Sequence, residues 1–152
     1  DGVLAELIAE HAQRVTCVDI SATVITAARK RLASLTNVDF CEADMHQLPL
    51  KSQAYDHVFL MHALSYTRTP EKVLKEATRL LRPRGRLIIA TLNAHRHEAA
   101  MEAYDHLNLG IAPARLQKML EACGLEVESC RVSSRETRPP YFEVVTALAQ
   151  RR

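Results

Sequence analysis

The sequence predicts an α/β fold in which a mostly parallel, doubly wound sheet ends in an antiparallel hairpin. Three observations support this prediction. Strand-like runs rich in β-branched residues alternate with helical segments of about a dozen residues, a pattern typical of crossover units on a parallel sheet. Two of the early strands lead into an aspartate. The last two strands follow each other without a helix between them, which favours an antiparallel pair at the sheet edge.

Composition and charge exclude several classes of protein. The chain has 152 residues, of which 47% are hydrophobic and 25% charged, as expected for one globular domain with its own core. A net charge of +2 is too small to indicate a nucleic-acid or anionic membrane surface. No apolar run approaches the roughly 20 residues of a membrane span, and no signal-peptide pattern opens the chain. We therefore expect a cytoplasmic protein with no membrane partner.

The four cysteines, Cys17, Cys41, Cys123 and Cys130, are scattered and form no C-x-x-C pair. Three of them fall in strand-like runs. We expect them to be small buried hydrophobic side chains in a reducing compartment, rather than disulfide partners or zinc ligands.

The amino-terminal third is predicted to form two helix–strand units. Ser21 is a favourable N-cap, and the helix that follows it is expected to bury Val24, Ala27, Ala28 and Leu32. The expected elements are a helix at 3–11, a strand at 15–20, a helix at 21–35 and a strand at 38–44.

The rest of the chain continues to alternate strands and helices as far as residue 92, after which a polar segment and two consecutive strands break the pattern. Pro70 suits the first turn of a helix, Gly85 is expected to supply a turn, and Gly124 is expected to end a helix. Residues 95–107 are polar and are expected to form a covering helical segment. The other expected elements are a strand from Tyr55, a helix at 70–82, a strand at 86–92, a helix at 113–124, and strands at 125–134 and 141–150.

Two acids mark a candidate ligand site. Asp19 and Asp44 each follow a predicted strand, and in doubly wound sheets ligands bind at the carboxyl ends of the strands. A carboxylate at the first strand end can accept hydrogen bonds from both hydroxyls of a ribose, and one on the next strand can accept from an adenine amino group. Ile20 and Met45, which follow the two acids, could sandwich the base. Each aspartate alone would also suit a helix N-cap.

Three segments resemble class I S-adenosylmethionine (SAM)-dependent methyltransferases of the ubiquinone/menaquinone-type branch. They are DGVLAELIAEHAQRVTCVDIS, VDFCEADMHQLPLKSQAYDHVFLMHALSY and LLRPRGRLIIATL, the last with Arg84 where glycine is usual. The resemblance implies a Rossmann-like methyltransferase fold over residues 1–152, SAM as cofactor and a small-molecule methyl acceptor. It adds Asp1, Gly2 and Met61 to the cofactor-binding residues Asp19, Ile20, Asp44 and Met45.

A finer resemblance comes from the carboxyl-terminal third. DHLNLGIAPARLQKMLEACGLEVESCRV and SRETRPPYFEVVTALA resemble the methyltransferase-like domain that lies C-terminal to ArsR-type winged-helix repressors. This leaves a second function open, a domain that senses SAM or S-adenosylhomocysteine and regulates transcription. DNA would then bind only through a winged-helix domain outside this chain, and a homodimer is also open. A nicotinamide oxidoreductase is a third alternative, because Asp19 alone would suit its ribose; Asp44 and the terminal hairpin argue against it.

The resemblance also implies a missing element. The chain opens at Asp1-Gly2, inside the family's glycine-rich motif, so we expect a domain fragment that lacks the first, central strand of the sheet. Val15, Val18, Val58 and Leu60 are expected to lose apolar neighbours. Ser65 stands where relatives often have histidine, which weakens a proton-transfer role at that position.

Methyl transfer needs no nucleophilic residue, because the sulfonium is itself electrophilic and positioning supplies most of the catalysis. No catalytic residue is therefore assigned. If the acceptor must lose a proton, the candidates near the expected strand ends are His62, Tyr66, Asp105 and His106, each of which also suits a structural role. The H-x-H sequence at 95–97 suits a solvated loop better than a metal site, since no third ligand stands at useful spacing.

Overall fold

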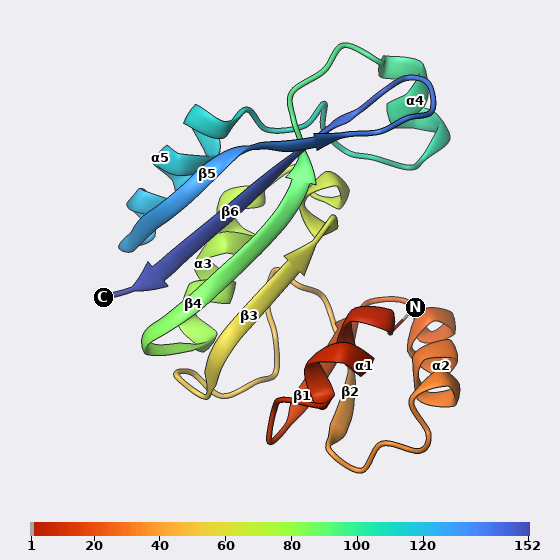
Figure 1. Cartoon of the computed structure of the whole chain (residues 1–152), viewed down its shortest axis with the longest axis vertical. Coiled ribbons are helices and arrows are strands. Elements are labelled where there is room, and N and C mark those ends of the chain that lie inside the picture. The colour runs from red at the N-terminus through yellow and green to blue at the C-terminus, as the bar shows by residue number, and fades with distance from the viewer. Residues whose placement is uncertain (1) are drawn as a thin grey trace. The chain divides into compact units, whose positions relative to one another are not determined.

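The computed structural model describes residues 2–152, which divide into two compact units, Asp1–Pro49 and Leu50–Arg152. Unit 1 contains α1 (Val3–Ala9), β1 (Val15–Asp19), α2 (Ala22–Arg31) and β2 (Val38–Glu42) (Figure 1). β1 and β2 pair in parallel, with Val15 opposite Val38 and Asp19 opposite Glu42. The parallel pairing predicted for these two strands is confirmed.

α2 begins where the sequence predicts, but it buries a different face. The Ser21 hydroxyl accepts the Val24 N–H at 3.3 Å, which confirms the N-cap. The buried side chains are Ile25, Ala28 and Leu32, whereas Val24 is 39% exposed and Ala27 is also exposed. The expectation for Val24 and Ala27 is therefore wrong. Apolar residues lie on two faces of this helix, and packing in unit 1 buries the face that carries Ile25.

Unit 2 contains a four-stranded sheet in the order β3-β4-β6-β5. β3 and β4 are parallel, while β6 is antiparallel to both β4 and β5, so the predicted terminal hairpin is confirmed. The elements are β3 (Tyr55–Met61), the 3-10 helix η1 (Ala63–Tyr66), α3 (Pro70–Leu80), β4 (Leu81–Leu92), α4 (Glu98–Ala103), α5 (Pro113–Ala122), β5 (Leu125–Arg135) and β6 (Glu143–Arg151).

α3 and α5 cover one face of this sheet (Figure 1) and enclose the core of unit 2. The core side chains include Leu74, Leu87, Ile89, Leu116, Leu120, Val145 and Ala149, each 1% exposed or less. Alternate residues of β4 and β6 enter this core, as the two-residue repeat of a strand requires. The core therefore fixes β4, at whose carboxyl end the segment 93–111 begins.

The turn before β4 differs from the prediction. β4 already starts at Leu81, and the residue with the left-handed backbone is Arg84, with φ of 68°, rather than Gly85. Gly85 is needed for a close approach, since a Cβ there would lie 2.8 Å from the Arg82 carbonyl oxygen. A glycine would adopt this positive φ more readily, so the arginine strains this turn.

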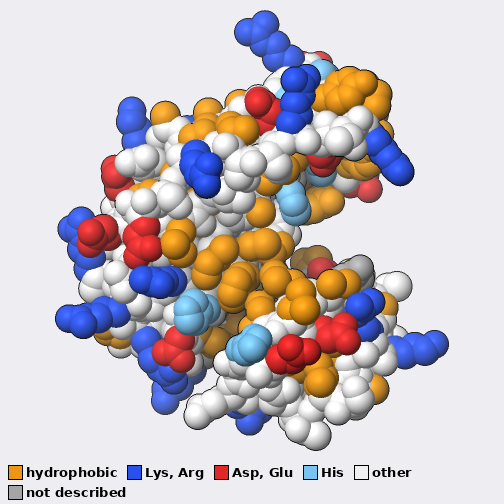
Figure 2. All heavy atoms as spheres, in the orientation of Figure 1, with side chains coloured by type: hydrophobic (Ala, Val, Ile, Leu, Met, Phe, Trp, Pro, Cys, Tyr) orange, Lys and Arg blue, Asp and Glu red, His pale blue; other side chains and the backbone are white. Residues whose placement is uncertain are grey.

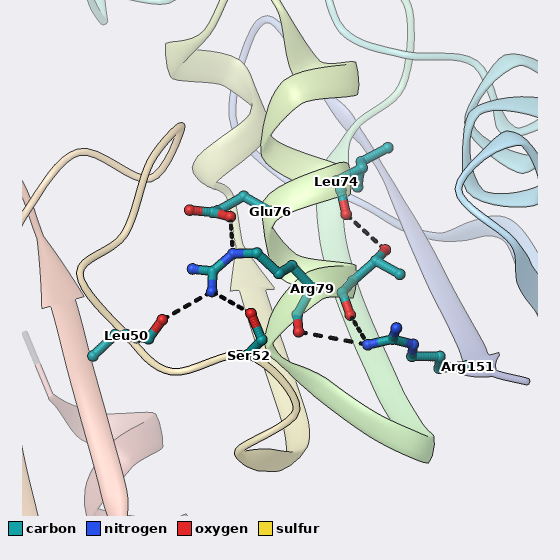
Figure 3. A network of polar contacts seen from close by, with 7 residues as sticks. Leu50, Ser52, Leu74, Glu76, Arg79 and Arg151 are labelled. Carbon is teal, nitrogen blue, oxygen red and sulfur yellow. Dashed lines mark hydrogen bonds and ion pairs between the residues drawn. The ribbon is translucent and has the colours of Figure 1, made fainter.

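Hydrogen bonds connect the carboxyl end of α3 with the loop at residues 50–52 and with the end of β6 (Figure 3). Arg151 Nη1 donates to the carbonyl oxygens of Thr78 at 3.0 Å and Leu81 at 2.6 Å. Arg79 Nη1 donates to the Leu50 carbonyl at 2.9 Å and the Ser52 hydroxyl at 2.8 Å. The ion pair with Glu76 raises the pKa of Arg79 above its ordinary value. The positive charge of Arg79 in the last turn of α3 also interacts favourably with the dipole of that helix.

β3 lies at one end of the sheet order, and hydrophobic side chains are exposed over it, including Phe59 at 37% and Met61 at 38% (Figure 2).

All four cysteines are free thiols, and they are half-buried rather than buried as expected. No helix within residues 2–152 is long and apolar enough to cross a membrane.

Candidate functional site

Asp19 stands at the carboxyl end of β1, where the sequence predicts a ligand-binding acid. Its side chain is half-buried, and Oδ1 accepts the Ser21 N–H at 2.8 Å. Its carbonyl accepts the Ala43 N–H at 3.0 Å, which fixes the strand end against the residues that follow β2. The carboxylate is thus held in one orientation at the start of α2.

Asp44 lies two residues beyond Glu42, the partner of Asp19 in the parallel ladder, so both acids occupy the same edge of unit 1's sheet. Asp44 Oδ1 accepts the His46 N–H at 2.8 Å and lies 2.5 Å from His46 Nδ1. The backbone N–H and the imidazole of His46 together hold the pKa of Asp44 below its usual value. His46 was not predicted from the sequence, although an aspartate side chain often accepts from the backbone N–H two residues on, as Asp44 does from His46.

The two apolar residues expected beside the acids have different environments. Ile20 is 70% exposed, an unusual state for a large aliphatic side chain next to a carboxylate, and Met45 is half-buried. Two carboxylates that accept hydrogen bonds, with apolar side chains beside each, suit a ligand that combines hydroxyl and amino donors with a flat ring.

Gly2 is the N-cap of α1. It has a left-handed backbone, with φ of 86°, and its carbonyl accepts the Glu6 N–H in the first turn of α1. An added Cβ would lie 3.2 Å from Leu32 Cδ1, so the turn packs tightly against the end of α2. Asp1, also expected at the cofactor, lies outside the described residues.

In unit 2 the predicted residues meet at the carboxyl end of β3. Met61 is the last residue of the strand, and His62 follows with a left-handed backbone, its N–H donating to the Ala90 carbonyl at 2.7 Å. Tyr66, at the end of η1, makes an edge-on contact with His106 at 5.3 Å between ring centroids. The structure thus brings Tyr66 and His106 together, while Asp105 is exposed.

Hydrogen bonds hold the His106 segment against η1. The Leu107 N–H donates to the Ser65 carbonyl at 2.7 Å, and Asn108 Nδ2 donates to the carbonyls of Leu64 at 2.6 Å and Thr67 at 2.8 Å. Burial and the nearby His62 lower the pKa of His106, which Asp105 partly offsets. A neutral imidazole at ordinary pH is the consequence.

Four further aromatic side chains lie in the same region and were not assigned from the sequence, namely His95, His97, Tyr104 and Phe142. In the 95–97 loop, Arg96 and His97 are exposed, as expected, while His95 is half-buried and its ring packs on Phe142 with centroids 4.7 Å apart. This contact forms because Phe142, directly before β6, approaches from a distant part of the chain, so no local pattern reveals it. Among residues 2–152, no group of three or more His, Cys, Asp or Glu side chains is arranged to hold a metal ion.

Comparison with known proteins gives a family match and a shared fold. The family described as "Methyltransferase domain" matches residues 1–89. A demethylmenaquinone methyltransferase of Clavibacter sepedonicus is 28% identical over 113 residues, which cover 74% of this chain and 46% of that protein. The chain thus spans less than half the length of this curated relative.

Solved structures share the fold at low identity. One described as a methyltransferase, from Bacillus halodurans C-125, superposes with a TM-score of 0.83 at 17% identity, covering 98% of this chain and 87% of that one. The [4+2]-cyclase SpnF superposes with a TM-score of 0.81 at 18% identity, covering 99% and 70%. The N-methyltransferase NodS of Bradyrhizobium japonicum, in complex with S-adenosyl-L-homocysteine, gives 0.78 at 16% identity, covering 99% and 72%. The cyclase shows that this fold serves other reactions too.

Proposed function

Because the chain belongs to the methyltransferase domain family, we propose that the protein transfers a methyl group from SAM to a small-molecule acceptor in the cytoplasm. The observation that carries the proposal is the pair of acids at the carboxyl edge of β1 and β2 in unit 1. The parallel ladder places them on neighbouring strand ends, where a nucleoside with a donor at each end can reach both.

Asp19 is proposed to hold the ribose. Its Oδ1 is already oriented by the Ser21 N–H, so little side-chain freedom is lost when the ribose hydroxyls donate to the carboxylate. Ribose hydroxyls are donors and the ionised carboxylate is purely an acceptor, so these hydrogen bonds are charge-assisted.

Asp44 is proposed to accept from the adenine amino group, with Ile20 and Met45 against the faces of the base. The low pKa of Asp44 keeps its carboxylate ionised, which an amino donor requires. Gly2 and Asp1 are proposed near the methionine part of SAM, and Met61 stays a cofactor-binding residue that only the family resemblance predicts. The positive φ and tight packing of Gly2 support a turn with no side chain, as close approach of a ligand to backbone requires.

A nucleoside analogue tests the adenine assignment. The wild-type protein should bind adenosyl cofactor more tightly than the inosyl analogue, which has an oxygen in place of the amino group. Asp44→Asn presents a donor as well as an acceptor and should lose that preference. Equal discrimination by both proteins would show that the adenine is held elsewhere. Turnover is tested with methyl-labelled SAM, whose label must appear in a product other than the protein.

The unpaired edges of β1 and β3 support one more proposal, that a further strand of the protein pairs with a free sheet edge. Within residues 2–152, β1 has no partner on the side opposite β2, and β3 is the end strand of its sheet. The side chains of Val15, Val18, Val58 and Leu60 are all half-buried instead of buried, as expected for strands that lack a neighbour. A protein extended at its amino end by a strand and a turn should then melt at a higher temperature than residues 1–152; equal melting would contradict this proposal.

The regulatory alternative stays a prediction from the sequence. It would require a winged-helix domain to bind DNA, and binding of SAM or S-adenosylhomocysteine, without turnover, would change DNA affinity. A homodimer likewise stays a prediction. Methyl transfer by the full-length protein to a small molecule, with DNA affinity unchanged by SAM, would exclude the regulatory function.

A further inference from the structure

Residues 94–106, which we call the strap, connect two firmly held points of unit 2. At the amino end of the strap, the Asn93 N–H donates to the Glu143 carbonyl at 2.9 Å. At its carboxyl end, the Leu107 N–H donates to the Ser65 carbonyl at 2.7 Å. The strap therefore has fixed ends, and the order of its middle depends on contacts of its own.

The helix within the strap contributes little to holding it in place. α4 is six residues long and has no buried side chain. A helix of this length is marginal in water unless other parts of the protein pack on it, because the first turn is costly to form. The side chains that hold the strap must therefore lie outside the faces of α4.

Aromatic rings supply these contacts, in a group that we call the ring cluster: His95, His97, Tyr104 and His106 of the strap, with Tyr66 of η1 and Phe142. Phe142 is 5% exposed, and its ring centroid lies 4.7 Å from that of His95 and 5.9 Å from that of His97. The His106 ring lies 5.7 Å from Tyr104 and 5.3 Å from Tyr66. The turn between β5 and β6, which carries Phe142, lies beside α4 (Figure 1).

The hydrogen bonding of His95 fits only a neutral ring. The His97 N–H donates to His95 Nδ1 at 3.1 Å, so Nδ1 presents a lone pair and the ring hydrogen sits on Nε2. Nε2 is buried and has no hydrogen-bond partner among the described residues. A charged imidazole carries a hydrogen on both nitrogens. Charging His95 would therefore break the bond from His97 and leave both ring donors without an acceptor.

The groups around His95 oppose a charge on it as well. Burial lowers its pKa most, followed by the nearby His97 and His106. The charged groups next to its contact partners in the chain are Arg96 in the strap and Glu143 on β6, and the carboxylate of Glu143 already accepts from a side-chain amide at 3.1 Å. His95 is therefore neutral at ordinary pH.

His106 has the same restriction. Its Nδ1 is buried and has no partner among the described residues, so a hydrogen added there would find no acceptor. Burial, and then the nearby His62, lowers the pKa of His106, while Asp105 offsets part of this effect. The other titratable groups against its ring, Tyr66 and Tyr104, are uncharged below pH about 10. His106, like His95, packs as a neutral ring.

We propose that the strap opens in acid: it stays closed while His95 and His106 are neutral, and it opens when both take up a proton. Opening brings the charged imidazoles into water, which supplies the acceptors and the hydration that the ring cluster does not. The hydrogen bonds at Asn93 and Leu107 join backbone groups that do not titrate. The strap therefore opens between its fixed ends while the sheet of unit 2 stays folded.

Opening takes up protons, because the pKa values of both histidines are lower in the closed strap than in water. The closed strap has its full stability above the ordinary histidine pKa of about 6.5, and it loses stability as the pH falls through the lowered values. Each histidine that gains a full proton on opening raises the opening constant by about tenfold per pH unit. Two histidines together give up to about a hundredfold per pH unit.

Hydrogen exchange of backbone amides in the full-length protein measures this opening constant. The reporters are the amides of Met101, Tyr104 and His106, which donate to carbonyls within the strap. After correction for the intrinsic exchange rate at each pH, their opening constants should rise steeply between about pH 7 and about pH 5.5. Those of Ile89 and Ala147, which pair in the sheet, should stay constant. A parallel rise in the sheet would mean that acid unfolds the whole unit and would overturn the proposal.

Variants that cannot titrate isolate the two histidines. His95→Asn keeps an acceptor near the His97 N–H, and His106→Phe keeps a ring in the cluster. Each should reduce the dependence to about tenfold per pH unit, and the double variant should show almost none, whatever its level of protection. His57→Asn, at an exposed histidine of β3 outside the strap, should keep the wild-type dependence. An undiminished dependence in the double variant would overturn the proposal.

Nitrogen NMR of the wild-type protein gives a test that needs no variant. At pH about 7 the rings of His95 and His106 should both be neutral, with the hydrogen of His95 on Nε2, and both should titrate below about 6.5. If either histidine titrates at or above that value, the closed strap binds its proton as well as the open one does. That result would overturn opening by two protons.

Discussion

Asp44 and His46 form a compact pair at the edge of unit 1's sheet, with Asp44 Oδ1 2.8 Å from the His46 backbone nitrogen and 2.5 Å from its Nδ1. Both contacts favour the ionised carboxylate and lower its pKa, the backbone N–H more than the ring. The pair therefore keeps Asp44 an acceptor into acidic solution, where a solvated aspartate would begin to take up a proton.

His46→Ala removes the ring contact and keeps the backbone N–H, so the pKa of Asp44 should rise part of the way toward its ordinary value. Since the lowered pKa belongs to an acid, the acceptor is present at high pH and is lost as the pH falls through that pKa. Adenosyl-ligand binding should thus weaken at a higher pH in the variant than in the wild type. Carboxyl carbon NMR measures the pKa directly, and an unchanged value would show that the imidazole contributes nothing.

Gly110 and Gly124 provide a matched test of backbone strain against steric contact. Both have left-handed backbones, with φ of 82° and 83°. An added Cβ at Gly110 would lie 2.2 Å from the Asn93 carbonyl oxygen, whereas at Gly124 it would meet nothing within 4 Å. Gly124→Ala should cost about 1–2 kcal/mol from strain alone. Gly110→Ala should cost more, because backbone must move; equal denaturant midpoints would contradict this packing.

Arg151 is expected to stabilise the junction of β6 with α3. Arg151→Met keeps the aliphatic stem but leaves the Thr78 and Leu81 carbonyls without this donor, which should cost about 1–3 kcal/mol of unfolding free energy. Arg152→Met, at the exposed next residue, is the control and should change stability by less than about 0.5 kcal/mol. Similar losses in both variants, measured by chemical denaturation, would show that the loss comes from charge alone.

Local patterns predict the elements and the first part of the candidate site well. The Ser21 cap, the Asp19 strand end and the Gly124 helix end follow from side-chain and backbone chemistry that acts within a few residues. The parallel pairing of β1 and β2 then brings Asp44 to the same edge without further information.

Features that depend on distant contacts could not be predicted. The helix after Ser21 has apolar residues on two of its faces, and only packing determines that Ile25 is buried and Val24 exposed. The burial of His95 depends on Phe142, which lies almost fifty positions away and arrives with the last strand. The positive φ of Arg84 contradicts the preference of its residue type, so a local rule assigns the turn to Gly85 instead.

The most direct test of the central claim is a calorimetric titration of the full-length protein with SAM, comparing the wild type with Asp19→Ala. Loss of a charge-assisted acceptor should cost about 1.5–3 kcal/mol and weaken SAM binding by roughly tenfold to a hundredfold. Asp39→Ala, which removes an acid of β2 paired with Arg14, should leave the affinity unchanged. Thermal unfolding of each variant checks that the fold is retained. An Asp19→Ala protein that is folded and binds SAM as tightly as the wild type would contradict the assignment of this strand end to the cofactor.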